Sequence, residues 1–175
     1  IDLRIQTADR DVDLLAEGVP LGIRGGAAAD WPDYELLPIA PEEIYAVAGP
    51  AYIARSGQPA TPAEMTYHRL IHLEEPFRPA ANWKEWFQSA GVNGSVANRG
   101  LQINDYVLVI QAVMEGQGIG LGWRHLTDRL VASGLLVQIT DHVMKTGLHF
   151  HVAWPKNREL GDSARKVRDW LAAQA

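Results

Sequence analysis

Apolar residues in the second half of the chain recur at a spacing that predicts a helix followed by a strand. One face of this helix collects four apolar residues, namely Val107, Ile110, Val113 and Met114. Asn104 or Asp105 can cap its first turn, because either side chain accepts hydrogen bonds from free backbone N–H groups. Gly116 and Gly118 favour a reversal of the chain, and residues 119–123 then form a buried strand. The glycines on either side of Leu121 allow a packed helix or a small ligand to approach the backbone.

The first part of the chain has patterns typical of a strand, a helix and a second strand. Residues 3–7 alternate between apolar and polar side chains, which predicts a strand. Residues 11–18 predict a short helix that ends at Gly18, and residues 19–24 predict the second strand. A helical connection between two strands implies that they are parallel, with a ligand crevice beyond the strand ends.

The remaining residues continue this alternation of helices and strands. Strands are expected at 34–39, 43–48, 70–73, 95–101, 135–139 and 148–154, and helices at 50–57, 82–91 and 123–133. The first two strands are separated by Pro41. Asp162 or Ser163 can cap a final helix. Its buried face is expected to hold Ala164, Val167, Trp170 and Leu171.

Composition excludes several functional classes. The 175 residues are 47% hydrophobic and carry a net charge of −5, so this segment is not expected to hold nucleic acid by itself. The sequence has no cysteine, which excludes disulfides, thiolate catalysis and cysteine-ligated zinc and fits a cytoplasmic protein. No apolar run reaches membrane-spanning length. Since residues 1–7 are typical of the middle of a fold, we expect further sequence before Ile1.

Seven longer sequence words together resemble one known family. They are DVDLLAEGVPLGIRGG (11–26), EEIYAVAGPAYIARSGQPATPAEM (42–65), HRLIH (68–72), WKEWFQSAGV (83–92), DYVLVIQAVMEGQGIGLGW (105–123), SGLLV (133–137) and VRDWL (167–171). In this order they resemble the effector-binding (substrate-binding) domain of LysR-type transcriptional regulators, in the subgroup of glycine-cleavage and β-lactamase-inducer activators. The words extend over nearly the whole sequence.

The resemblance implies an α/β fold of two Rossmann-like lobes joined by two crossing strands, like that of type II periplasmic binding proteins. Residues 1–48 would begin the first lobe, residues 49–150 would form the second, and residues 151–175 would supply the return strand and C-terminal helix of the first. The first strand and helix of lobe one would precede this sequence. A winged helix-turn-helix that binds DNA would also precede it.

The function that the resemblance implies is ligand sensing without catalysis. A small effector in the cleft between the lobes would control DNA binding by the N-terminal helix-turn-helix, in a cytoplasmic homodimer or homotetramer. The effector classes considered are an amino acid, a betaine, a carboxylate and a cell-wall fragment. No cofactor is expected. The alternative is a periplasmic-type solute-binding protein without a role in DNA binding.

In this family the loops after the strand ends line the cleft, which indicates candidate effector-binding residues. The first lobe contributes Thr7, Ala8, Arg24 and Gly25, and Val47 and Gly49 lie at the first crossing between the lobes. The second lobe contributes His72, Glu74, Trp83, Asn104, Asp105, Gly122 and Trp123. Arg24 could hold a carboxylate or form a structural salt bridge with a neighbour such as Asp9. Asn104 and Asp105 could contact a ligand or serve only as helix caps.

Three other kinds of site have ordinary structural explanations in this sequence. Trp83, Trp86 and Trp123 could form an aromatic wall for a quaternary ammonium, although aromatic residues at this spacing are usually core. The histidine pairs 149/151 and 68/72 lack a nearby acidic motif, so no metal site is expected. The candidate serine nucleophiles fit turns or caps better than a hydrolase or transferase site: Ser56, Ser89, Ser95 and Ser133.

Overall fold

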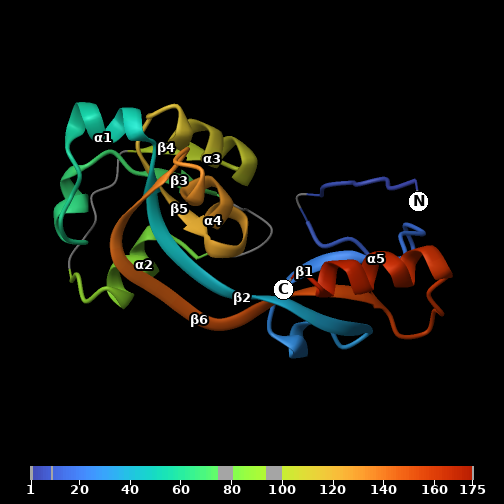
Figure 1. Cartoon of the computed structure of the whole chain (residues 1–175). Coiled ribbons are helices and arrows are strands. Elements are labelled where there is room, and N and C mark those ends of the chain that lie inside the picture. Colours follow the sequence, from blue (N-terminus) through green and yellow to red (C-terminus); the bar gives the residue numbers. More distant parts are fainter. Residues whose placement is uncertain (1, 9, 75–80, 94–99, 175) are drawn as a thin grey trace. The chain divides into compact units, whose positions relative to one another are not determined.

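The computed structural model of the protein describes residues 2–8, 10–74, 81–93 and 100–174 (Figure 1). The chain divides into two compact units. Unit 1 consists of Ile1–Glu42 and Thr146–Ala175, and unit 2 is the continuous segment Glu43–Lys145. The lobe boundaries expected from the family, at residues 48 and 150, remain a prediction.

Both connections between the units lie inside long strands. Strand β2 extends over Tyr34–Ala48 and strand β6 over Val137–Pro155, and each is a long continuous ribbon in Figure 1. The sequence had instead predicted two short strands in each region. Pro41 does not interrupt β2, because β5 pairs only with Ile44–Ala48 and the strand beside Pro41 needs no hydrogen bond to β5.

Unit 1 is built on the pair of β1 (Gly22–Gly26) and β6, followed by helix α5 (Asp162–Ala172). The pair is antiparallel, with Gly22 opposite Ala153 and Gly26 opposite His149. The parallel strand–helix–strand unit expected from residues 3–7, 11–18 and 19–24 does not form, because only its last strand is present, as β1. A one-turn 3-10 helix, η1 (Ala28–Asp30), follows β1.

Two elements predicted before β1 do not form. Residues 3–7 are not a strand, and Leu3 and Ile5 are 63% and 80% exposed. Alternating residues make a strand only where a neighbour completes the hydrogen-bond ladder, and in the described residues β1 pairs with β6 alone. Residues 14–18 form a turn that closes at Gly18 (φ 67°). Of its three backbone hydrogen bonds, the one from the Glu17 N–H to the Asp13 carbonyl has α-helical spacing, and a single such bond is too few to propagate a helix.

Helix α5 forms where the sequence predicts it, but its details differ. Its N-cap is Gly161, and neither Asp162 nor Ser163 caps the helix, since Asp162 pairs with Arg165 instead. The expected buried face is also wrong. No residue of α5 is buried, and Trp170 is 60% exposed, while Ala164, Val167 and Leu171 are half-buried.

Unit 2 follows the local sequence signals closely. Its helices are α1 (Pro50–Ser56), α2 (Trp83–Ser89), α3 (Tyr106–Met114) and α4 (Arg124–Ala132), with the 3-10 helix η2 at Glu64–Tyr67. Strand β5 (Ile119–Trp123) pairs antiparallel with β2. Strands β3 (Ile71–Leu73) and β4 (Leu101–Ile103) form a separate parallel pair. The strand expected at 95–101 falls largely on residues 95–99, outside the described residues.

The core of unit 2 lies between its strands and helices α3 and α4. The cluster of buried side chains consists of Tyr45, Val47, Ile71, Val109, Ile110, Val113 and Leu136. The glycines on either side of Leu121 let helices pack closely on β5. Of the two possibilities given by the sequence, a packed helix or a small ligand, the structure shows the packed helix. A Cβ on Gly120 would lie 2.5 Å from Cγ2 of Val113 on α3, so this position has no space for a side chain.

Candidate functional site

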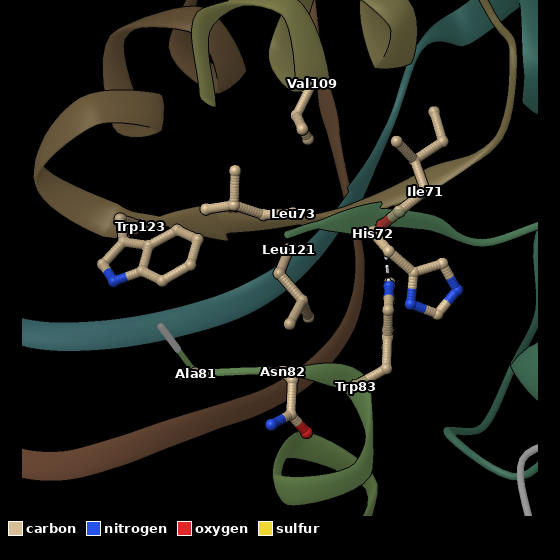
Figure 2. Close-up of a pocket in the computed structure, with 9 residues that line it drawn as sticks. All are labelled: Ile71, His72, Leu73, Ala81, Asn82, Trp83, Val109, Leu121 and Trp123. Atoms are coloured by element: carbon tan, nitrogen blue, oxygen red, sulfur yellow. Dashed lines mark hydrogen bonds between the residues drawn. The ribbon is translucent and has the colours of Figure 1, made fainter. Parts of the chain in front are cut away.

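A pocket in unit 2 opens beside strands β3 and β5 (Figure 2). Its cavity volume is only about 20 Å³, and the wider hollow around it, which is open to solvent, holds about 280 Å³ of empty space. Nine residues line it: Ile71, His72, Leu73, Ala81, Asn82, Trp83, Val109, Leu121 and Trp123. We refer to this site as the pocket.

One wall of the pocket is fixed by the start of helix α2. The Asn82 side chain accepts a hydrogen bond from the backbone N–H of Glu85 (3.1 Å), and the Glu85 carboxylate accepts one from the N–H of Asn82 (3.1 Å). This capping box sets the position of the first helical residue, Trp83. The Trp83 indole N–H then donates to the carbonyl of Ile71 on β3 (2.9 Å), the dashed line in Figure 2. Helix α2 and strand β3 are thus joined at the pocket.

The opposite wall is Trp123, the last residue of β5. Its backbone N–H donates to the Tyr106 hydroxyl oxygen (3.0 Å), and the two rings meet edge to face with centroids 5.1 Å apart. Burial raises the pKa of the Tyr106 phenol, so the group stays protonated at ordinary pH. The contact therefore orients the Trp123 wall without placing a charge beside the pocket.

The pocket interior is apolar. In Figure 2 the Leu73 side chain points toward the Trp123 ring, with Val109 above it and Leu121 below it. Asn82 and His72 are the polar members of the lining set, and that set contains no Asp, Glu, Lys or Arg. Because an unpaired charge is costly to bury, this surface suits an uncharged or aliphatic part of a ligand.

The structure brings together three of the residues predicted as candidate sites. His72, Trp83 and Trp123 all line the pocket. The Nε2 atom of His72 is buried and has no hydrogen-bond partner in the described part of the chain. Trp86 belongs to the core instead, since it is fully buried, and its ring meets that of Trp83 edge to face at 5.5 Å.

Other predicted residues of unit 2 have structural partners. Asp105 caps α3 by accepting from the N–H of Leu108 (3.1 Å), whereas Asn104 is exposed and makes no cap. Glu74 is exposed, and its backbone N–H donates to Ile103 (2.8 Å). These residues are not among those that line the pocket.

Three candidates along β2 and β5 are packing positions. Val47 belongs to the buried core cluster. The N–H of Gly49 donates to the carbonyl of Val113 (3.1 Å), and a Cβ at Gly49 would lie 2.6 Å from that oxygen. A Cβ at Gly122 would lie 3.0 Å from Oγ1 of Thr127 on α4. Both glycines therefore allow a close approach of the backbone to a helix, and Val47 fills the core with its side chain.

Arg24 in unit 1 is engaged in structural contacts. It is only 7% exposed, its NH2 group donates to the carbonyl of Val12 (2.7 Å), and its guanidinium lies 5.2 Å from the centre of the Trp31 ring. Its ion-pair partner is Asp11 at 4.0 Å. Asp9, the neighbour suggested by the sequence, lies outside the described residues. These contacts favour the structural interpretation of Arg24, and its role as a carboxylate anchor remains a prediction.

The remaining unit 1 candidates are not among the residues that line the pocket. Thr7 and Ala8 are exposed and belong to no strand. Gly25 is in β1 opposite Phe150, and a Cβ there would lie 3.3 Å from the Phe150 ring. Among the described residues, no three His, Asp or Glu side chains are grouped so that they could hold a metal ion. No described helix is both long and apolar enough to pass through a lipid bilayer.

Sequence reasoning missed most of the apolar lining of the pocket. The missed residues are Ile71, Leu73, Ala81, Asn82, Val109 and Leu121. Asn82 carried a usable signal, because an Asn followed three residues later by Glu predicts a capping box. Val109 and Leu121 had no such signal, since a core residue and a pocket residue share the same apolar pattern.

Comparisons with known proteins match the whole chain to one family. The family profile described as "LysR substrate binding domain" matches residues 1–175. The AmpR transcriptional activator of Rhodobacter capsulatus is 26% identical over 175 residues, which cover 100% of this chain and 57% of that protein. The glycine cleavage system transcriptional activator of Escherichia coli strain K12 is 27% identical over 176 residues, covering 100% and 56%. The chain thus spans about half the length of these relatives.

Solved structures give the same result for the fold. The effector domain of AmpR from Pseudomonas aeruginosa is 25% identical with a TM-score of 0.78, over 99% of this chain and 80% of that one. The AmpR effector-binding domain of Citrobacter freundii has a TM-score of 0.77 at 22% identity, over 98% and 82%. The predicted α/β fold class and the predicted family are both confirmed.

Proposed function

Because the chain belongs to the LysR substrate-binding domain family, we propose that it is the ligand-sensing part of a DNA-binding transcriptional regulator. Effector binding would change the conformation of this domain and so alter how an N-terminal helix-turn-helix binds DNA. The whole protein would act as a cytoplasmic homodimer or homotetramer. These proposals are supported by the relatives, which are transcriptional activators.

The observation that carries the proposal is the pocket itself. It is a small, mainly apolar hollow with a few polar groups, and this combination of lining residues is the one that small-molecule sites use. The effector classes in question are an amino acid, a betaine, a carboxylate and a cell-wall fragment. We propose that an uncharged part of the effector occupies the pocket, while any charged group binds at the cleft that the family resemblance implies between the lobes.

The main test is a thermal-shift screen of amino acids, betaines, short carboxylates and cell-wall fragments. A ligand that binds only the folded state stabilises it by about 2.7 kcal/mol at a concentration of 100 times Kd. We expect at least one compound to raise Tm, and Leu121→Phe, which fills the pocket, to remove that increase. Leu126→Phe is the matched control, because Leu126 is 52% exposed on α4. An increase that is equal in both variants would exclude the pocket as the binding site.

The rival function is a periplasmic-type solute-binding protein. The family match favours the regulator. The coding sequence upstream of Ile1 decides between them, since a helix-turn-helix segment and a cleavable leader have different compositions. A leader in place of the DNA-binding segment would overturn the proposed function.

A further inference from the structure

We propose that Arg124 is a positioning residue that transmits occupancy of the pocket to both strands that leave unit 2. The inference rests on the proposed function, because it takes the pocket to be part of the effector site. Arg124 directly follows Trp123, which forms the pocket wall, and it is the first residue of helix α4. A displacement of Trp123 therefore moves the base of the Arg124 side chain.

Arg124 reaches both strands through a single carboxylate. Its Nε atom lies 2.7 Å from Oε2 of Glu43 on β2, and the Nζ atom of Lys145 on β6 lies 3.0 Å from Oε1 of the same group. Glu43 and Lys145 are the first and last residues of unit 2. We call these three residues the clamp, and they join α4 to both strands at the point where the strands leave the unit.

The clamp is partly shielded from water. The Glu43 side chain is only 18% exposed, while those of Arg124 and Lys145 are 36% and 72% exposed. The hydrogen bond from Lys145 and the positive charges of Lys145 and Arg124 hold the pKa of Glu43 below its ordinary value. A carboxylate that stays charged between two cations resists separation from either of them.

Further hydrogen bonds make the first turn of α4 a rigid block. The Thr127 hydroxyl is fully buried and lies 2.9 Å from both the Trp123 carbonyl oxygen and the Tyr45 hydroxyl. Tyr45 in turn donates to Asp128 (2.8 Å), and the Arg124 guanidinium lies 5.2 Å from the centre of the Tyr45 ring. Because these contacts fix Trp123 to the helix, motion of the pocket wall is passed on to Arg124 rather than absorbed by a loop.

Xenon is a suitable probe, because it enters apolar cavities and requires no knowledge of the effector. Amide, indole and arginine Nε–H signals of the protein are recorded by NMR with and without dissolved xenon. We expect shifts at Trp83 and Trp123, which report on the pocket, and at Arg124 and Lys145, which report on the clamp. In Arg124→Met the pocket signals should still shift, while the shift at Lys145 is lost.

Two further variants separate transmission from a merely structural role. Glu43→Gln keeps the shape of the Glu43 side chain in the clamp but removes its negative charge. We expect the xenon-induced shift at Lys145 to be lost in this variant too. Arg168→Met is the matched control, since Arg168 pairs with Asp169 on α5, and it should leave every xenon response unchanged.

The outcomes distinguish the inference from the function on which it rests. If the pocket signals shift but Lys145 responds equally with and without Arg124, the clamp transmits nothing and the inference is overturned, while the pocket remains a binding site. If the Trp83 and Trp123 signals do not shift with xenon in the unmodified protein, the pocket does not admit an apolar ligand. That result would overturn both the inference and the proposed binding site.

Discussion

The two units differ sharply in how much apolar surface they bury. Among the described residues, the buried apolar side chains of unit 1 are Leu14, Val152, Ala153, Pro155 and Leu160, and all others belong to unit 2. Hydrophobic burial is the main stabilising contribution in folding. Unit 2 therefore has a core sufficient to hold a shaped pocket, whereas unit 1 relies more on backbone pairing and on polar contacts such as those of Arg24.

The difference indicates which unit can carry a precise site. A pocket keeps its shape only if the residues behind it are packed, and Val109 and Ile71 belong both to the pocket lining and to the core of unit 2. In unit 1 the face of α5 is only half-buried.

The largest expected effect is the loss of a core tryptophan from unit 2. Trp86 is fully buried and donates to the carbonyl of Ile44 (3.2 Å), so Trp86→Ala should lower the free energy of unfolding of unit 2 by about 3–5 kcal/mol. Trp170→Ala in unit 1 removes a ring that is 60% exposed and should cost roughly 0.5 kcal/mol or less. Urea unfolding, monitored by tryptophan fluorescence and circular dichroism, measures the loss of unfolding free energy in both variants. Equal losses would remove the contrast between the units.

The next effect concerns the polar support of unit 1. Arg24→Met keeps the aliphatic stem but removes the donor to Val12, and we expect a loss of about 1–3 kcal/mol. The hydrogen-exchange rates of the β1 amides should increase, while the β5 amides in unit 2 should keep their slow exchange. If β1 exchange is unchanged and binding of an anionic ligand is lost instead, Arg24 is an anchor for the ligand rather than a structural residue.

A smaller effect tests the helix cap in unit 2. Asp105→Ala removes the acceptor for the N–H of Leu108 and should lower the free energy of unfolding by about 1 kcal/mol. Asn104→Ala is the control, since Asn104 is exposed and does not cap the helix. Chemical denaturation compares the two variants. A larger loss for Asn104→Ala would contradict the assignment of the cap.

The smallest effect is a pH dependence that both units share. Burial lowers the pKa of His142 in unit 2 and of His151 in unit 1 from the ordinary value of 6.5. The unfolded chain then binds protons first, so stability falls as the pH drops below about 6.5. NMR titration of the ring protons gives both pKa values, and His142→Gln and His151→Gln should each weaken the dependence in its own unit. A pKa above 6.5 for either ring would contradict its burial.

The sequence predicted unit 2 better than unit 1 because the signals in unit 2 are local. Pro50, Asn82 and Asp105 each mark the start of a helix through contacts within one turn, and all three helices form there. The alternation at residues 3–7 depends on a partner strand that local sequence does not specify. The antiparallel pairing of β1 likewise depends on β6, more than 100 residues away.

The candidate site was predictable only in part, for a related reason. The aromatic residues Trp83 and Trp123 stand out in the sequence, and both line the pocket. Arg24 also stood out as a charged side chain near a strand end, yet its partners lie at Val12 and Trp31 in its own unit. Residue type thus indicated which side chains matter, while their partners depended on the tertiary fold.

Unit 2 is one uninterrupted segment, whereas unit 1 is assembled from two segments on either side of it. On the ribosome, every residue of unit 2 is made before the second half of unit 1 exists. Domains generally fold as units during synthesis. The nascent chain should therefore complete the pocket before the part of β6 that pairs with β1 has been synthesised.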